Sequence, residues 1–270
     1  MALQKCAKCG CQFEGNLSAC PDCHTPRAPR KSPTAKKIIT MAALLGVGAI
    51  AAIVIRTREP EVPVESSPVR VPAVDLQKTK SAAEGGDPNA QNLLGEIYAN
   101  GEGVPSDYKE AAKWYRLAAE QGHAGGQKHL ADLYDAGQGV SQDGGEAAKW
   151  LQLAAAQGHV GAQYSLAVMF ASGRGVKLND AEAVKWYRRA AEQCDSAAQY
   201  NLGHRYLYGR GVPQDQIEAY KWLSLSANQG LTDAAEILKS LKSTMKSEQI
   251  KEAKRRVAGF VVTKPTNAIR

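Results

Sequence analysis

Catalytic signatures are missing from this chain of 270 residues. The sequence contains no H-E-x-x-H, no G-x-S-x-G and no Walker loop, the patterns that place zinc ligands, a nucleophilic serine or phosphate-binding amides. The polar residues that recur do so with the period of an internal repeat, as the residues of a scaffold do. We therefore expect that the protein is not an enzyme.

Cysteine is nearly absent beyond residue 23. Five of the six cysteines lie between residues 6 and 23, and the sixth is Cys194. A disulfide framework would spread its cysteines over the fold, so this cluster indicates a metal site in a short N-terminal module.

The long middle region has no excess of basic residues. Residues 74 to 238 carry 15 Lys and Arg against 20 Asp and Glu, while residues 1 to 37 carry 7 against 2 and residues 239 to 270 carry 9 against 2. The net charge of +7 therefore comes from the two ends of the chain. This distribution argues against a nucleic-acid-binding stripe. We expect neither a nucleic-acid partner nor a small-molecule substrate.

One long apolar run is present. Residues 38 to 55 contain no charge and are flanked by Lys37 and Arg56. A helix of this length covers about 27 Å, which suits a bilayer core of about 30 Å, and predicts a transmembrane helix. A buried core helix fits poorly because the Pro-rich linker 56–73 follows, and a cleavable signal peptide fits poorly because 37 residues precede the run.

Basic residues set the expected orientation of this helix. Five Lys and Arg lie within residues 27 to 37, which include the basic juxtamembrane segment 31–37, against three within residues 56 to 70. The positive-inside rule then predicts a cytoplasmic N-terminus in a single-pass protein of the inner (cytoplasmic) membrane. The region after the linker would lie in the periplasm or its equivalent.

The N-terminal cysteines form two C-x2-C pairs separated by ten residues. The pairs are Cys6 with Cys9 and Cys20 with Cys23. Each pair can direct two thiolates at one tetrahedral ion, so we expect these four residues to bind a structural Zn2+ within residues 1–30. The spacing resembles the zinc ribbons at the amino termini of many bacterial membrane proteins. Cys11 in place of Cys9, or His24 in place of Cys23, are alternative ligands.

Tryptophan marks an internal repeat. The chain has four tryptophans, each 36 residues from the next: Trp114, Trp150, Trp186 and Trp222. A unit of this length is one helical hairpin, which cannot bury its apolar face alone and must stack on copies of itself. We expect the tryptophan rings to fill the core between adjacent hairpins.

Each repeat has the same parts. Apolar residues at helical spacing predict a first helix, a G-x-G-V turn follows, and alanines around the tryptophan predict a second helix. The glycines permit positive φ at the turn; as a phosphate-binding loop the motif is weak because no strand precedes it. An acidic residue near the start of each second helix is a candidate N-cap, although the third is shifted by one residue: Asp107, Asp143, Asp180 and Asp215.

These residues resemble the SEL-like repeat (SLR), a relative of the tetratricopeptide repeat. Four full units fit, at 87–122, 123–158, 159–194 and 195–230, and flanking half units extend the array to 74–242. The resemblance implies an all-α fold, a right-handed α-solenoid whose concave face binds proteins. Gly144 and Gly145 depart from the pattern and predict a local soft spot, as does Cys194 at a repeat end where glycine is usual.

Candidate partner-binding residues lie on the first helices, outside the apolar ladder. They are Asn92, Lys128, Ser165 and Asn201. The turn histidines His123 and His159 are expected to be surface or capping groups rather than metal ligands. A β-lactam-binding branch of the family carries paired cysteines in every repeat, a feature that this array lacks.

The C-terminal segment 243–262 predicts a capping helix before the tail 263–270. Ile250, Ala253, Val257 and Phe260 share one face, which would seal the last hairpin. Its basic residues offer an alternative attraction to anionic lipid, peptidoglycan carboxylates or an acidic partner.

The parts together predict a membrane-anchored scaffold or adaptor that presents an SLR solenoid outside the cytoplasm and binds protein partners. Two alternatives are an SLR enzyme acting on the cell wall or on β-lactams, and a cytoplasmic regulator tethered to the membrane.

Overall fold

The computed structural model describes residues 3–5, 12–14 and 76–262. The first two segments are strands β1 (Leu3–Lys5) and β2 (Gln12–Glu14), which pair antiparallel with Leu3 opposite Glu14. The third segment contains α1 (Leu76–Glu84), α2 (Pro88–Asn100), α3 (Tyr108–Glu120), α4 (Ala124–Ala136), α5 (Gly144–Ala156), α6 (Val160–Ser172), α7 (Asp180–Glu192), α8 (Ser196–Tyr208), α9 (Gln216–Asn228), α10 (Thr232–Thr244) and α11 (Ser247–Ala258).

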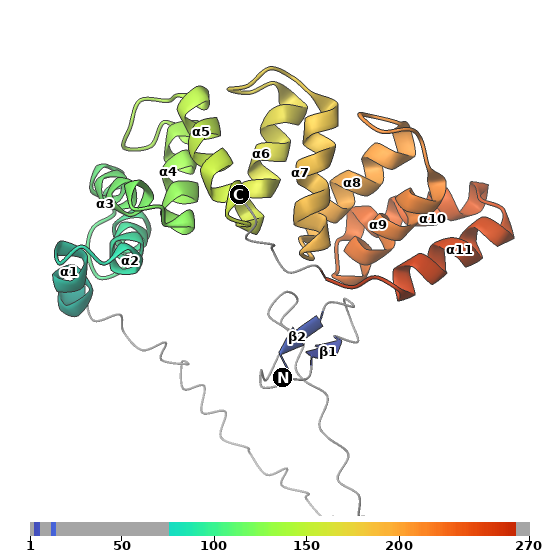
Figure 1. The fold of residues 1–270 in the computed structure, drawn as a ribbon, viewed down its shortest axis with the longest axis horizontal. Helices are drawn as coiled ribbons and strands as arrows, with labels where there is room; N and C mark the ends of the chain where they lie inside the picture. The colour runs from blue at the N-terminus through green and yellow to red at the C-terminus, as the bar shows by residue number, and fades with distance from the viewer. Residues whose placement is uncertain (1–2, 6–11, 15–75, 263–270) are drawn as a thin grey trace, which may run out of the picture. The chain divides into compact units, whose positions relative to one another are not determined.

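Consecutive helices lie side by side through residues 76–262 (Figure 1). Each helix from α2 to α9 packs mainly on the helices before and after it, and α10 and α11 both pack on α9. Residues 76–262 contain no strand. The prediction of an all-helical solenoid of stacked hairpins is confirmed for this part of the chain.

Glycine ends the first helix of every hairpin. Gly101, Gly137, Gly173 and Gly209 have φ of 74°, 68°, 72° and 67°, and each donates its backbone N–H to a carbonyl four residues earlier. This left-handed conformation is cheap only for glycine, which explains the first glycine of G-x-G-V. The second glycine also has a positive φ, and at Gly175 an added methyl group would in addition overlap the carbonyl oxygen of Gly144.

The second helices are capped as expected at three of four positions. Asp107, Asp143 and Asp215 each accept hydrogen bonds from two backbone amides of the first turn. The expectation for Asp180 was wrong. Asn179 caps α7 instead, and the Asp180 carboxylate pairs with Arg205 of the next repeat.

The weak start predicted for the second unit does not shorten its helix. α5 begins at Gly144 and has 13 residues, the same length as α3, α7 and α9. A methyl group on Gly144 would lie 2.9 Å from the Cα of Gly175. The glycine therefore permits close approach of the next turn.

The tryptophans are less buried than the sequence suggests. Trp114, Trp150 and Trp186 are only partly buried, whereas Trp222 is 3% exposed and lies edge-on to Phe260 at a ring distance of 5.6 Å. The residues that follow them are fully in the core: Tyr115, Leu151, Tyr187 and Leu223. Trp150 nevertheless packs against the apolar clusters of two adjacent hairpins, as expected for a spacer.

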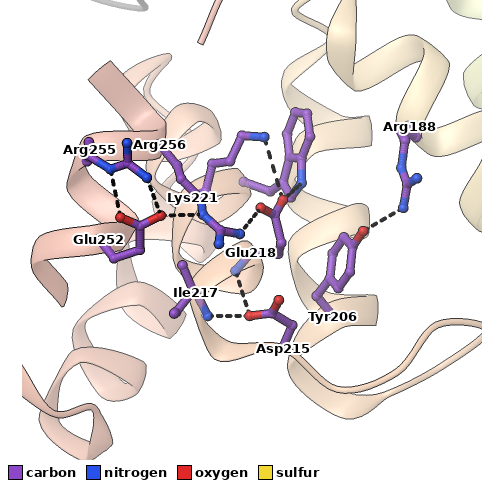
Figure 2. A network of polar contacts seen from close by, with 10 residues as sticks. Arg188, Tyr206, Asp215, Ile217, Glu218, Lys221, Glu252, Arg255 and Arg256 are labelled. Atoms are coloured by element: carbon purple, nitrogen blue, oxygen red, sulfur yellow. Dashed lines mark hydrogen bonds and ion pairs between the residues drawn. The ribbon is translucent and has the colours of Figure 1, made fainter. Parts of the chain in front are cut away.

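Polar contacts fasten α11 to the last hairpin. Glu218 on α9 accepts hydrogen bonds from Arg256 on α11 at 2.6 Å and from the Trp222 indole at 3.0 Å (Figure 2). Ala253 and Phe260 are buried as well, in two adjoining apolar clusters. Apolar burial and a charge-assisted hydrogen bond thus act together at this end of the array.

Candidate interaction surface

Buried glutamines set the position of each first helix. Gln91, Gln127, Gln163 and Gln199 are at most 4% exposed. Each donates to the carbonyl of an alanine near the end of the preceding helix at 3.1 to 3.2 Å and accepts from a second glutamine at 2.7 to 2.8 Å. The donors of the second bond are Gln121, Gln157, Gln193 and Gln229. Sequence reasoning missed this ladder, although both sets of glutamines recur every 36 residues.

The four predicted partner-binding residues lie on α2, α4, α6 and α8. We call the surface made by the accessible side chains of these helices the first-helix surface. Asn92 and Lys128 occupy one repeat position, but Ser165 and Asn201 occupy the next position along the helix. The four residues therefore do not form a single row.

Adjacent repeats connect the two rows. Asn92 Oδ1 lies 3.0 Å from His129 Nδ1, and the Tyr164 hydroxyl makes a hydrogen bond with the side chain of Asn201. Asn92 also donates to Glu96 at 2.7 Å, and Asn201 donates to the Ala197 carbonyl at 2.9 Å. Lys128 pairs with Asp132 in the same way, so three of the predicted residues are held by neighbours, which gives the first-helix surface a defined polar pattern.

His129 is neutral at pH 7. Burial lowers the pKa of its imidazole to about 4, against a smaller opposing effect of Glu96. Its ring lies 4.9 Å from the ring of Tyr115, between the hairpins. The 3.6 Å contact with Glu96 is consequently not an ion pair at that pH.

The turn histidines are N-caps, as predicted. His123 Nδ1 accepts from the Gly126 amide at 3.0 Å, and His159 Nδ1 accepts from the Ala162 amide at 3.2 Å. Asp195 has the same role in the fourth repeat, where it accepts from the Ala198 amide at 2.7 Å. A ring nitrogen that accepts a hydrogen bond must be unprotonated, in keeping with the lowered pKa that burial imposes on His159.

Metal ligation was expected outside the helices. Within residues 3–5, 12–14 and 76–262, no group of three or more His, Cys, Asp or Glu is placed to hold a metal ion. Cys6, Cys9, Cys20 and Cys23 lie outside the described residues, so the zinc site stays a prediction.

The membrane helix was also expected outside the described part of the chain. No helix between residues 76 and 258 is both long and apolar enough to cross a bilayer. The predicted span 38–55 lies outside the described residues.

Comparison with known proteins agrees with the repeat geometry. A crystal structure of a protective antigen present in uropathogenic Escherichia coli strains, which has an SLR fold, is 38% identical, with a TM-score of 0.61 over 68% of this chain and 40% of the antigen. This chain therefore spans less than half the length of that protein. A Sel1 repeat protein from Oxalobacter formigenes is 31% identical, with a TM-score of 0.58 over 68% of this chain and 85% of that one. A search of curated proteins gave no match.

The repeat family is also identified from the sequence itself. A family model of the Sel1 repeat matches residues 88–123, 124–159, 160–193 and 196–231, more than half of the chain. Each match contains one first helix, one turn and one second helix of the structure. The chain belongs to the Sel1 repeat family.

Proposed function

We propose that this protein is a membrane-anchored scaffold that holds a protein partner on the first-helix surface. Sel1 repeat proteins typically mediate protein–protein interactions. The observation that carries the proposal is the arrangement of α2, α4, α6 and α8, which the buried glutamine ladder holds in register while their polar side chains remain accessible. A surface whose backbone is already ordered loses little entropy when a partner binds.

The anchoring part of the proposal rests on sequence. Residues 38 to 55 are uncharged and long enough to span, and more basic residues precede them than follow them. The N-terminus would then lie in the cytoplasm, where Cys6, Cys9, Cys20 and Cys23 stay reduced and bind structural Zn2+. The Pro-rich linker would present the repeat array on the other side.

A reporter fused after Arg270 tests the topology. Alkaline phosphatase, which is active only outside the bacterial cytoplasm, should be active in the fusion, and green fluorescent protein that folds only in the cytoplasm should be dark. The reverse pattern would favour the cytoplasmic regulator. Release of the protein from membranes by alkaline carbonate would contradict anchoring altogether.

Crosslinking in intact membranes tests the scaffold. Asn92→Arg or Ser165→Arg places a bulky positive charge on the first-helix surface and should reduce partner capture by about tenfold, because an interface core tolerates an added charge poorly. Lys109→Glu is the matched control, since this residue lies at the exposed start of α3. Equal capture by all variants would rule out the first-helix surface as the binding face.

A further inference from the structure

A hollow of about 200 Å³ opens on the first-helix surface between α4 and α6. Its floor is apolar and includes Leu151, Val168 and Met169. Its rim carries Asp132 and Asp135 of α4, Tyr164 and Ser165 of α6, and Arg174 of the following turn. The predicted binding residue Ser165 thus lines a concave site.

The hollow exists because two side chains that border it are smaller than their equivalents at the neighbouring junctions. At the preceding junction the equivalent residues are Tyr115 and His129, whose rings lie 4.9 Å apart. At the α4–α6 junction these positions hold Leu151 and Ser165, which are smaller. The side chains that fill the space elsewhere are therefore absent here.

The next junction is also filled. Tyr187, the equivalent of Leu151, lies with its ring 5.9 Å from the ring of Tyr164. The Arg205 guanidinium covers the Tyr187 ring at 5.6 Å. The open space is thus particular to the middle of the array rather than a property of every junction.

The rim is rich in hydrogen-bond acceptors. Asp132 and Asp135 are three residues apart and face the same side of α4. The lining contributes two carboxylates and the hydroxyls of Tyr164 and Ser165, which outnumber the two nearby cations, Arg174 in the lining and Lys128 beside Asp132. A ligand that supplies donors and positive charge suits this balance.

The present partners of the two carboxylates are exchangeable. Arg174 Nη2 lies 2.9 Å from Asp135, and the Arg174 side chain is 55% exposed. Lys128 pairs with Asp132, whose side chain is 44% exposed. The other side chain of each pair is less exposed, at 27% for Asp135 and 26% for Lys128. Both pairs still reach solvent on one side, so an incoming cation can share or replace them.

We propose that the hollow receives a lysine side chain of the partner, with its aliphatic stem on the apolar floor and its ammonium between Asp132 and Asp135. This inference rests on the proposed scaffold function and specifies the chemistry of its partner. An ammonium donates in three diverging directions, which suits acceptors on separate turns, whereas a guanidinium fork suits one carboxylate held in its plane.

The test uses the full chain in nanodiscs with methyl groups labelled for NMR. The probe is n-butylammonium, the end of a lysine side chain, and butanol and butyrate are controls with the same stem. We expect saturable shifts of the Leu151, Val168 and Met169 methyls with n-butylammonium at about 0.1 M or below, and binding at least about tenfold weaker for both controls. No shifts, or equal affinity for the three probes, would overturn the proposal.

Two double variants test separately the open space of the hollow and the charge of its two carboxylates. Leu151→Tyr with Ser165→His restores the residue pair of the preceding junction, so it should keep the fold and abolish n-butylammonium binding. Asp132→Asn with Asp135→Asn should weaken n-butylammonium binding about tenfold and leave butanol binding unchanged. Binding that survives in the filled variant would show that the probe sits elsewhere.

The same filled variant links the hollow to the partner. It should lose crosslinked partner, whereas the control Lys109→Glu should not. Full capture by the filled variant would overturn the lysine proposal and leave the scaffold standing. The scaffold function itself would be overturned by a different result, namely a cytoplasmic signal from the reporter fusion or unchanged crosslinking by the Asn92 and Ser165 variants. The n-butylammonium titration tests only the hollow.

Discussion

Glu218 and Arg256 are 38 residues apart in sequence and 2.6 Å apart in the structure, where their hydrogen bond joins α9 to α11 (Figure 2). The Glu218 side chain is 18% exposed and also lies 3.6 Å from Lys221. This carboxylate therefore links the last full hairpin to the helix that covers it.

Removing the Glu218 carboxylate should loosen α11. Glu218→Gln weakens a partly buried bond to a charged partner and should cost about 1 to 2 kcal/mol, with faster amide exchange in residues 247 to 258. Hydrogen exchange and thermal unfolding measure both effects. Glu252→Gln is the control, because Glu252 bonds Arg255 and Arg256 within α11 itself and should change stability less.

The second glycine of the turn should be sensitive in a position-dependent way. Gly103 and Gly175 have φ of 76° and 69°, so alanine is strained at both by about 1 kcal/mol. A methyl group meets nothing within 4 Å at Gly103 but overlaps the Gly144 backbone at Gly175. Gly175→Ala should therefore lower the free energy of unfolding clearly more than Gly103→Ala, in denaturant titrations of the two variants.

The glutamine ladder should be stabilising. Gln163→Leu leaves the Gln193 amide without its 2.8 Å acceptor, while the Ala155 carbonyl keeps its bond from Gly158. The Gln193 amide then keeps only its 3.5 Å contact with the Arg189 carbonyl, so losing the bond should cost about 1 kcal/mol. Gln142→Leu, at an exposed turn, is the control. If the two variants melted at the same temperature, the ladder would not contribute to stability.

Acid should destabilise the array through His129. The pKa of His129 is about 4 in the folded protein and about 6.5 in the unfolded chain. Between pH 6.5 and pH 4 the unfolded state therefore binds a proton that the folded state does not bind. Stability that is complete above pH 6.5 should fall as the pH drops toward 4, by up to roughly 3 kcal/mol. His129→Gln should flatten the dependence of the melting temperature on pH over this range, and an unchanged slope would argue against it.

Zinc should accompany the intact N-terminal module. The purified full chain is expected to contain about one zinc per molecule, as a closed four-thiolate site requires. Cys20→Ser should lower the zinc content, measured by mass spectrometry of the metal, while Cys11→Ser should not. Loss of zinc in Cys11→Ser would instead make Cys11 a ligand.

Much of the fold was predictable because the repeat is regular. The 36-residue spacing of Trp114 and its equivalents predicted stacked hairpins, and the turn glycines and Asp107 predicted where helices end and begin. These features depend on local backbone conformation, which each repeat encodes in its own residues. The burial of the tryptophans was less predictable, since it depends on what the next element covers: Phe260 covers Trp222, while Trp114 stays partly exposed.

The candidate site, like the fold, was predictable only in part. The sequence by itself determined that Asn92, Lys128, Ser165 and Asn201 lie on first helices, because helical periodicity separates the accessible face from the apolar ladder. Their division into two rows follows from the same 36-residue period. Only the tertiary structure decided that Ser165 lines a hollow. The hollow depends on the sizes of side chains from three helices: Leu151 on α5, Ser165 on α6 and the facing residues of α4. The sequence pattern of one helix does not show how these side chains fill the space between them.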